Sequence, residues 1–237
     1  TMEKFVAALE SSDDFTFYLI DHDLTFDDTL AISGTNVLYG RGISLDSESD
    51  VLFRIAGDSP RASSLFIDGI KIGTGIEVSG TASLVIANAL LTDMRSGFAV
   101  SDSASLTMYN VTAFRNNVED FIYLSGIESS VTVLDSTIVD SGKITIRENS
   151  ASALWILNSI VIAEINNNAP GTSTMSMAYS ALSIGTNEYR QTTDTTFQMG
   201  TVYYTRDEDG TYHQAVVENG ALIPEDTVYY VSTSSNY

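Results

Sequence analysis

Apolar residues alternate with other residues in six short segments of the chain, and the six segments follow one template. Each begins with a small residue and carries apolar residues at its second and fourth positions, and five of the six end in Gly, Asn or Asp. Their first residues lie 19, 22, 25, 23 and 21 positions apart. Alternation predicts β-strands with one buried face, and a period near 22 residues is typical of a solenoid. The segments are residues 64–69, 83–88, 105–110, 130–135, 153–158 and 174–179.

The template also predicts a bend and a core. Gly, Asn and Asp tolerate left-handed backbone angles, so the sixth position is expected to turn the chain sharply. We expect Asn88, Asn110 and Asn158 to stack there, with their side-chain amides bonded between coils. The second and fourth positions are aliphatic or Met throughout, and stacked turns bury such side chains in one continuous core. The expected stack includes Ile86, Met108, Val133 and Ile156.

Two further strands complete each turn. A short strand follows the bend, and another precedes each template segment, at residues 76–78, 98–100, 122–124 and 144–146. Three strands per turn of about 22 residues resemble the right-handed parallel β-helix of the pectate-lyase-like superfamily, over roughly residues 1–197. The resemblance and the crossover rule for parallel strands imply right-handed coiling. The predicted fold class is therefore all-β, a single-stranded right-handed parallel β-helix.

The sequence on either side of the repeat predicts additional elements at both ends of the expected β-helix. Residues 2–9 have the apolar spacing of a helix, so an N-terminal capping helix is expected within residues 1–12. A cap is needed because the first coil would otherwise expose its core and strand edges. The repeat ends near residue 198, where β-forming segments and the turn signals Asp209-Gly210 and Asn219-Gly220 begin. We predict a capped β-helix at 1–197 and a small β-hairpin module at 198–237, which resembles Tyr-rich hairpin modules of phage structural proteins.

The charge and the cysteine content of the chain exclude several classes of partner and of metal site. The net charge is −20 and the lysines are Lys4, Lys71 and Lys143 only, so the surface repels phosphate backbones and we expect no nucleic acid partner. The absence of cysteine excludes a disulfide scaffold and thiolate metal sites. No signal peptide or membrane span is apparent, and no membrane contact is expected. We interpret the acidity as solubility of a long solenoid, with divalent-cation binding or high salt as alternatives.

The catalytic sets of β-helix enzymes are incomplete in this chain. Polygalacturonases carry clustered Asp residues with a Gly-His-Gly segment, which is absent here, and His22 and His213 are the only histidines. Pectate lyases place arginine beside calcium-binding carboxylates, whereas Arg95, Arg115 and Arg147 lie in predicted turns with few acids nearby. Carboxylates could still meet across coils about 4.8 Å apart. We expect no catalytic residue, and keep a polysaccharide-degrading lyase or hydrolase, or a tailspike depolymerase, as the alternative.

The densest acidic run is Asp21-His22-Asp23, with Asp13-Asp14 and Asp27-Asp28 close by. Hard cations bind several oxygen ligands, so one reading is a calcium site. The other reading, which we prefer, is a solvated edge of the first coil. The segment 207–210 resembles a fragment of an EF-hand loop, but a hairpin tip is expected there. No cofactor is expected, with Ca²⁺ as the open alternative.

The outward positions of the template are more apolar than a face in water requires, and contiguous exposed apolar surface marks interfaces. Aromatic side chains such as Tyr109 and Trp155 suit stacking on sugar rings. The cover could be the C-terminal hairpin module, a loop, another subunit of an oligomer, or a ligand, and we expect the chain after residue 198 or a neighbouring subunit to cover most of these side chains. The candidate contact surface is Phe66, Val85, Tyr109, Leu134, Trp155 and Leu157.

These observations favour a non-enzymatic, extracellular structural or adhesive module on a cell surface or a virion. We expect it to contact a glycan or a surface protein, including other virion or cell-surface subunits. Besides the enzyme alternative, a purely architectural virion fibre or decoration protein stays open.

Overall fold

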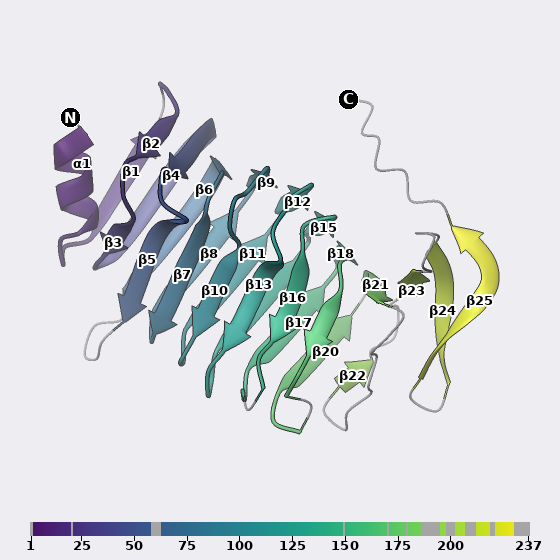
Figure 1. Ribbon diagram of the computed structural model, residues 1–237. Helices are drawn as coiled ribbons and strands as arrows, with labels where there is room; N and C mark the ends of the chain where they lie inside the picture. The colour runs from purple at the N-terminus through teal and green to yellow at the C-terminus, as the bar shows by residue number, and fades with distance from the viewer. Residues whose placement is uncertain are drawn as a thin grey trace.

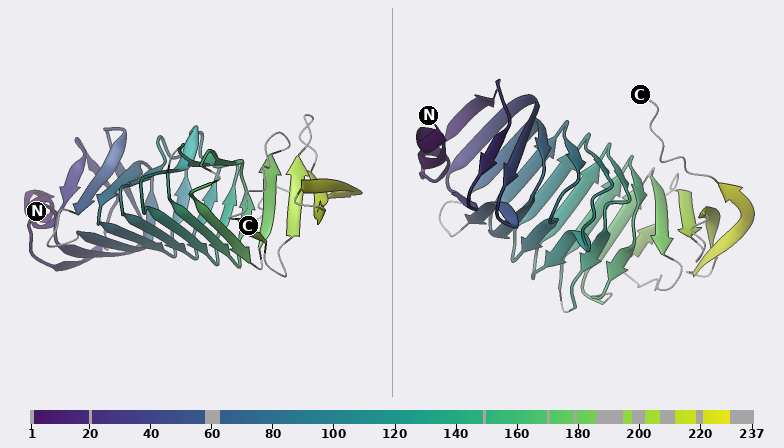
Figure 2. Two further views of the ribbon diagram at one scale, coloured as in Figure 1. Left: turned by 90° about the horizontal axis from the view of Figure 1, so that it is seen from below. Right: turned by 45° about the horizontal axis from the view of Figure 1, so that its top comes forward.

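The protein is a parallel β-solenoid whose N-terminal end is closed by one short helix, α1 (Met2–Leu9) (Figure 1). This computed structural model describes residues 2–19, 21–57, 63–148, 150–169, 171–178, 180–185, 195–197, 202–206, 212–218 and 221–229. Successive coils stack along one axis, so the molecule is a rod (Figure 2). The predicted all-β class, the parallel coils and the N-terminal cap are confirmed.

The six template segments of the sequence form the first strands of their coils, and β1 (Phe15–Leu19), the start of β4 (Thr35–Ser47) and β22 (Thr195–Phe197) take the same place in further coils. The six template strands are the start of β6 (Ser64–Ile72), β8 (Ser83–Ala87), β11 (Ser105–Tyr109), β14 (Ser130–Leu134), β17 (Ala153–Leu157) and β20 (Thr174–Ala178). Ser83 pairs with Ser64 on one side and with Ser105 on the other, and the later coils keep this register. The repeat alignment predicted from the sequence is therefore the register of the sheet.

The second and third strands form the other two sides of the coil. The second strands are β2 (Leu24–Phe26), the ends of β4 and β6, β9 (Leu90–Thr92), β12 (Thr112–Phe114), β15 (Thr137–Val139), β18 (Ile160–Ile162), β21 (Ala181–Gly185) and β23 (Val202–Arg206). The third strands are β3 (Leu30–Ile32), β5 (Val51–Gly57), β7 (Gly75–Gly80), β10 (Phe98–Ser101), β13 (Asp120–Ser125), β16 (Lys143–Ile146) and β19 (Ile165–Asn167), which form a sheet of their own.

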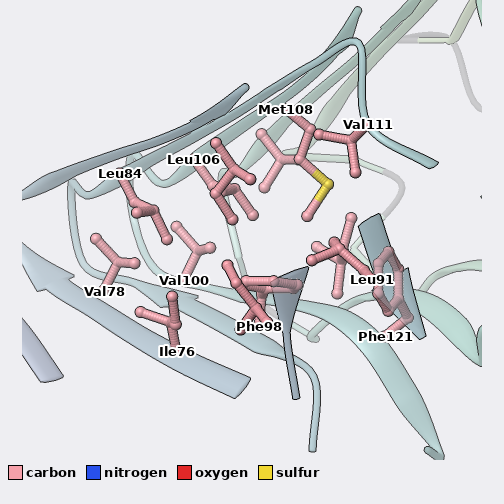
Figure 3. Packing of buried hydrophobic residues seen from close by; sticks show 14 of the residues in the cluster. Ile76, Val78, Leu84, Leu91, Phe98, Val100, Leu106, Met108, Val111 and Phe121 are labelled. Atoms are coloured by element: carbon pink, nitrogen blue, oxygen red, sulfur yellow. The ribbon is translucent and has the colours of Figure 1, made fainter. Parts of the chain in front are cut away.

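The core is a column of apolar side chains that runs along the inside of the rod. Ile86, Met108, Val133 and Ile156 are all 0 % exposed, as predicted. Figure 3 shows side chains of different sides of the coil meeting in this interior, for example Leu84 and Leu106 opposite Ile76 and Val100. Because no single coil can bury its own apolar face, each coil depends on its neighbours for stability.

The predicted bends are confirmed at the corner between the first and second strands. The backbone φ is 49° at Asn88, 51° at Asn110 and 48° at Asn158. Asn110 donates a hydrogen bond to Asn88 at 2.7 Å, and Asn88 donates to Asp68 at 2.7 Å. Further along, Asn158 donates to Asp135 at 2.6 Å. The corner therefore carries an asparagine ladder whose rungs tie one coil to the next.

The C-terminal strands extend the rod beyond its last coils. Strand β23 pairs in parallel with β21, and β24 (Tyr212–Glu218) pairs antiparallel with β23. Strand β25 (Ala221–Tyr229) pairs antiparallel with β24, with Glu218 opposite Ala221, so the pairing flanks the predicted Asn219-Gly220 turn. The residues of both predicted turns lie outside the described residues. The division at residue 198 stays a prediction.

Candidate functional site

The six candidate contact residues lie on the outward side of the first strands. Phe66 on β6 is beside Val85 on β8, and Leu134 on β14 lies between Tyr109 on β11 and Leu157 on β17. Their neighbours along each strand are buried, so strand alternation directs all six away from the core. The structure thus brings the predicted residues together on one continuous side of the rod.

These side chains are partly, not fully, accessible to solvent. Tyr109 is 44 % exposed, and the other five are half-buried. Ala87 points outward from β8 and yet is only 4 % exposed, which means that its neighbours close over it. Side chains on adjacent coils therefore shield one another in part.

A second property of this side was not predicted, namely the absence of charge. Strands β8, β11, β14, β17 and β20 each direct three side chains outward, and none of these is acidic or basic. We call this surface the uncharged face. Its three columns are Ser83, Ser105, Ser130, Ala153 and Thr174, then Val85, Thr107, Thr132, Trp155 and Ser176, then Ala87, Tyr109, Leu134, Leu157 and Ala178.

An aromatic row continues this side of the rod toward the N-terminus. The rings of Tyr18 and Tyr39 stack with centroids 5.3 Å apart and an interplanar angle of 17°. Tyr39 also meets Phe66 edge-on at 6.0 Å. Beside Tyr39, Asp68 is the carboxylate that borders the uncharged face. Tyr18, the last ring of this row, is 71 % exposed to solvent.

The described C-terminal strands do not lie over the uncharged face. Strand β23 pairs with β21, β24 with β23 and β25 with β24, and the three strands lie past the end of the coils (Figure 1). The predicted cover by the chain after residue 198 involves residues outside the described ranges, and cover by a neighbouring subunit also stays a prediction.

Many acidic side chains of the rod bind the neighbouring coil. Asp14 accepts a hydrogen bond from the Thr35 N–H at 2.9 Å, and Asp23 accepts one from the Ser44 N–H at 2.7 Å. The partners are 21 residues apart in both cases, which is one coil. Asp102, Asp120 and Asp135 also accept hydrogen bonds from the neighbouring coil, from a backbone N–H, a hydroxyl group and a side-chain amide, respectively. The sequence signal for these contacts is an Asp one coil length away from its partner.

One basic residue joins this set across two coils. Arg95 donates from Nη2 to Asp46 at 2.9 Å and to Thr74 at 3.0 Å, and Thr74 also donates to Asp46. Partial burial raises the pKa of Asp46, but hydrogen bonds from Thr74, the Ser47 N–H and Arg95 outweigh burial and hold the pKa below the usual 3.8. The sequence did not show this contact, because Arg95 and Asp46 are 49 positions apart.

The acidic run at the N-terminal end belongs to the same pattern. Asp14 and Asp23 hold the edge of the next coil through their carboxylates. Among the described residues, no three side chains of His, Asp or Glu are grouped closely enough to hold a metal ion. No helix within the described ranges has the length and apolar character needed to cross a membrane.

Comparisons of the chain with protein-family models, with curated proteins and with solved structures find no match. The geometry of the rod and its surfaces is therefore the basis for any functional conclusion.

Proposed function

We propose that the protein is a non-enzymatic structural or adhesive module that displays a rigid rod and makes contact through its uncharged face. The single observation that carries this proposal is that the uncharged face combines the absence of charge with accessible apolar and aromatic side chains in a strongly acidic molecule. The net charge of the chain is −20, and the first strands of five successive coils carry no charged outward side chain. Charge depletion combined with apolar and aromatic side chains is the signature of an interface core.

The carboxylates also support this proposal over the enzyme alternative. Glycoside hydrolysis requires a pair of carboxyl groups about 5–10 Å apart, one of them with a raised pKa. In this protein the carboxylates of Asp14, Asp23 and Asp102 accept hydrogen bonds from backbone N–H groups of the neighbouring coil. The pKa of Asp46 is shifted downward, opposite to the direction that a general acid needs. These carboxylates serve to hold coils together.

An extracellular position, on a cell surface or on a virion, is part of the proposal. It is supported by the acidic, cysteine-free composition and by the resemblance of the chain to pectate-lyase-like β-helices and to Tyr-rich hairpins of phage structural proteins. A rod of stacked coils holds a contact surface at a fixed distance from its point of attachment. The partner would be a glycan or a surface protein, and other subunits of the same assembly are included.

The proposal is tested by binding and by activity on the same preparation. We expect the purified protein to leave pectin, alginate and capsular glycans uncut, with no release of reducing ends or unsaturated products. We expect it to bind immobilised glycans or surface proteins through the uncharged face. The triple change Tyr109→Ser, Leu134→Ser and Trp155→Ser should remove that binding.

The matched control is Leu90→Ser with Ile160→Ser, which alters exposed apolar residues of the second strands, 42 % and 46 % exposed. It should bind like the wild type. Cleavage of a glycan that disappears on mutation of one carboxylate would overturn the proposal, and so would equal loss of binding in the control.

A further inference from the structure

We infer that the uncharged face binds a neutral, linear polysaccharide that lies along the rod axis, with Tyr109 and Trp155 as stacking platforms. This inference rests on the proposed function and names the class of its ligand. It comes from three independent properties of the face, namely its charge, the surroundings of its aromatic rings and its periodicity.

The charge of the molecule selects against charged partners. A net charge of −20 repels anionic polysaccharides such as pectin and alginate. A basic partner would find no carboxylate on the uncharged face itself. The neighbouring carboxylates lie outside it, Asp68 at its border and Asp135 on the adjoining corner. A neutral chain meets neither repulsion nor the cost of leaving a charge unpaired on binding.

The two aromatic rings of the face lie on different coils and differ in their neighbours. Trp155 lies between the small residues Thr132 and Ser176, whereas Tyr109 lies between Ala87 and Leu134. A ring flanked by small side chains can present its face to a ligand, and ring faces attract the apolar C–H faces of sugars. The row of Tyr18 and Tyr39 differs, since these two rings stack on one another at 5.3 Å.

The periodicity of the face matches a polymer. Parallel coils repeat every ~4.8 Å, so hydroxyl groups and apolar groups recur at that interval along the axis. The hydroxyl side is formed by half-buried Ser83, Ser105 and Ser130, with Thr107 and Thr132 in the next column. A linear glycan offers hydroxyls and apolar ring faces at regular intervals and can be held at several coils at once, which gives avidity without any single strong contact.

The experiment is a pull-down and affinity electrophoresis of the full chain with cellulose, chitin and xylan, and with alginate and pectin as anionic probes. We expect binding to at least one neutral polysaccharide and none to the anionic ones. Trp155→Ala and Tyr109→Ala should each weaken binding about tenfold or more, as loss of a central anchor does. Trp155→Tyr should keep most of it, and Leu90→Ala should bind within about twofold of wild type. Circular dichroism of each variant checks that the rod is folded.

Three results would overturn the inference. The first is failure of the wild type to bind any neutral polysaccharide. The second is binding that survives in the Trp155→Ala, Tyr109→Ala double variant. The third is a dimer, measured by light scattering, that the same variant dissociates, because a second copy would then be the occupant. If face variants lose binding to immobilised protein while no glycan binds, this inference fails and the proposed adhesive function stands.

Discussion

Replacing Asp135 by Asn should stabilise the rod, because it repairs a gap in the asparagine ladder. Asn110 donates to Asn88, Asn88 donates to Asp68 on the preceding coil, and Asn158 donates to Asp135. An ionised carboxylate is a hydrogen-bond acceptor only, so the Asp135 side chain cannot donate a hydrogen bond to Asn110. Asn at this position would keep the acceptor for Asn158 and add a donor. The backbone φ of 49° at Asp135 suits Asn as well as Asp.

The magnitude follows from the hydrogen bonds gained and weakened. A new neutral hydrogen bond contributes about 0.5–1.5 kcal/mol. The existing bond from Asn158 loses its charge assistance, which offsets part of that gain at an exposed corner. A net gain of about 0.5–1 kcal/mol corresponds to a rise of about 1–4 °C in the melting temperature of a chain of this size. Thermal unfolding followed by circular dichroism measures it.

Two controls separate the hydrogen bond from the loss of a negative charge. Asp93→Asn removes one carboxylate at another left-handed residue, with φ 56°, and should not raise the melting temperature by the same amount. Salt at about 0.5 M screens surface charge but leaves a hydrogen bond, so the gain in Asp135→Asn should persist there. Asn110→Asp removes the hydrogen bond that Asn110 donates to Asn88 and should lower the melting temperature. Equal or lower stability of Asp135→Asn would refute the reasoning.

Three further changes test the core, the cross-coil contacts and the coil spacing. Ile156→Ala should lower the free energy of unfolding by about 2–5 kcal/mol in urea titrations, since Ile156 is 0 % exposed; a loss below about 1 kcal/mol would contradict the stacked core. Asp46→Asn should be less stable than wild type at neutral pH. Because the folded pKa of Asp46 is lowered, this difference should close as the pH falls below 3.8, and a gap unchanged at pH 2 would count against it. Gly75→Ala should destabilise by about 1–3 kcal/mol or more, because its Cβ would lie 1.9 Å from the Gly97 carbonyl oxygen, whereas Gly171→Ala, with open space, should be nearly neutral.

Much of this fold could be predicted because the constraints repeat. Each of the six template segments has apolar residues at its second and fourth positions, and five of them carry Gly, Asn or Asp at the sixth, so an error in reading one coil is corrected by the others. Asn88 and Asn158 reveal the bend by residue type alone, since few residues accept a left-handed conformation. The pairing of strand β4 is less predictable from the sequence, because its register with β6 shifts between Tyr39 and Ile43 and the coil there does not follow the template.

The contacts between coils could not be predicted with the same certainty. Coil lengths vary, so the residue that lies above Asp46 cannot be found by adding one period. Arg95 is reached only after two coils, and its pairing with Asp46 emerges from the three-dimensional stacking. The candidate contact residues could be predicted from alternation, but the lack of charge on the face becomes visible only when outward positions of five strands are compared side by side.

The acidic groups that bind neighbouring coils and the uncharged face occupy different parts of this rod, and the separation has a physical consequence. Carboxylates such as Asp14, Asp102 and Asp135 lie at turns and corners, where they bind the neighbouring coil and keep other acidic molecules away. The uncharged face lies on strands, where β-pairing already holds the coils and no charged group is needed. The same stacking that stabilises the fold therefore produces a neutral surface of regular spacing within an acidic molecule. Adding a coil would lengthen that surface without changing its chemistry, so the proposed binding to a linear glycan should strengthen with rod length while solubility is maintained.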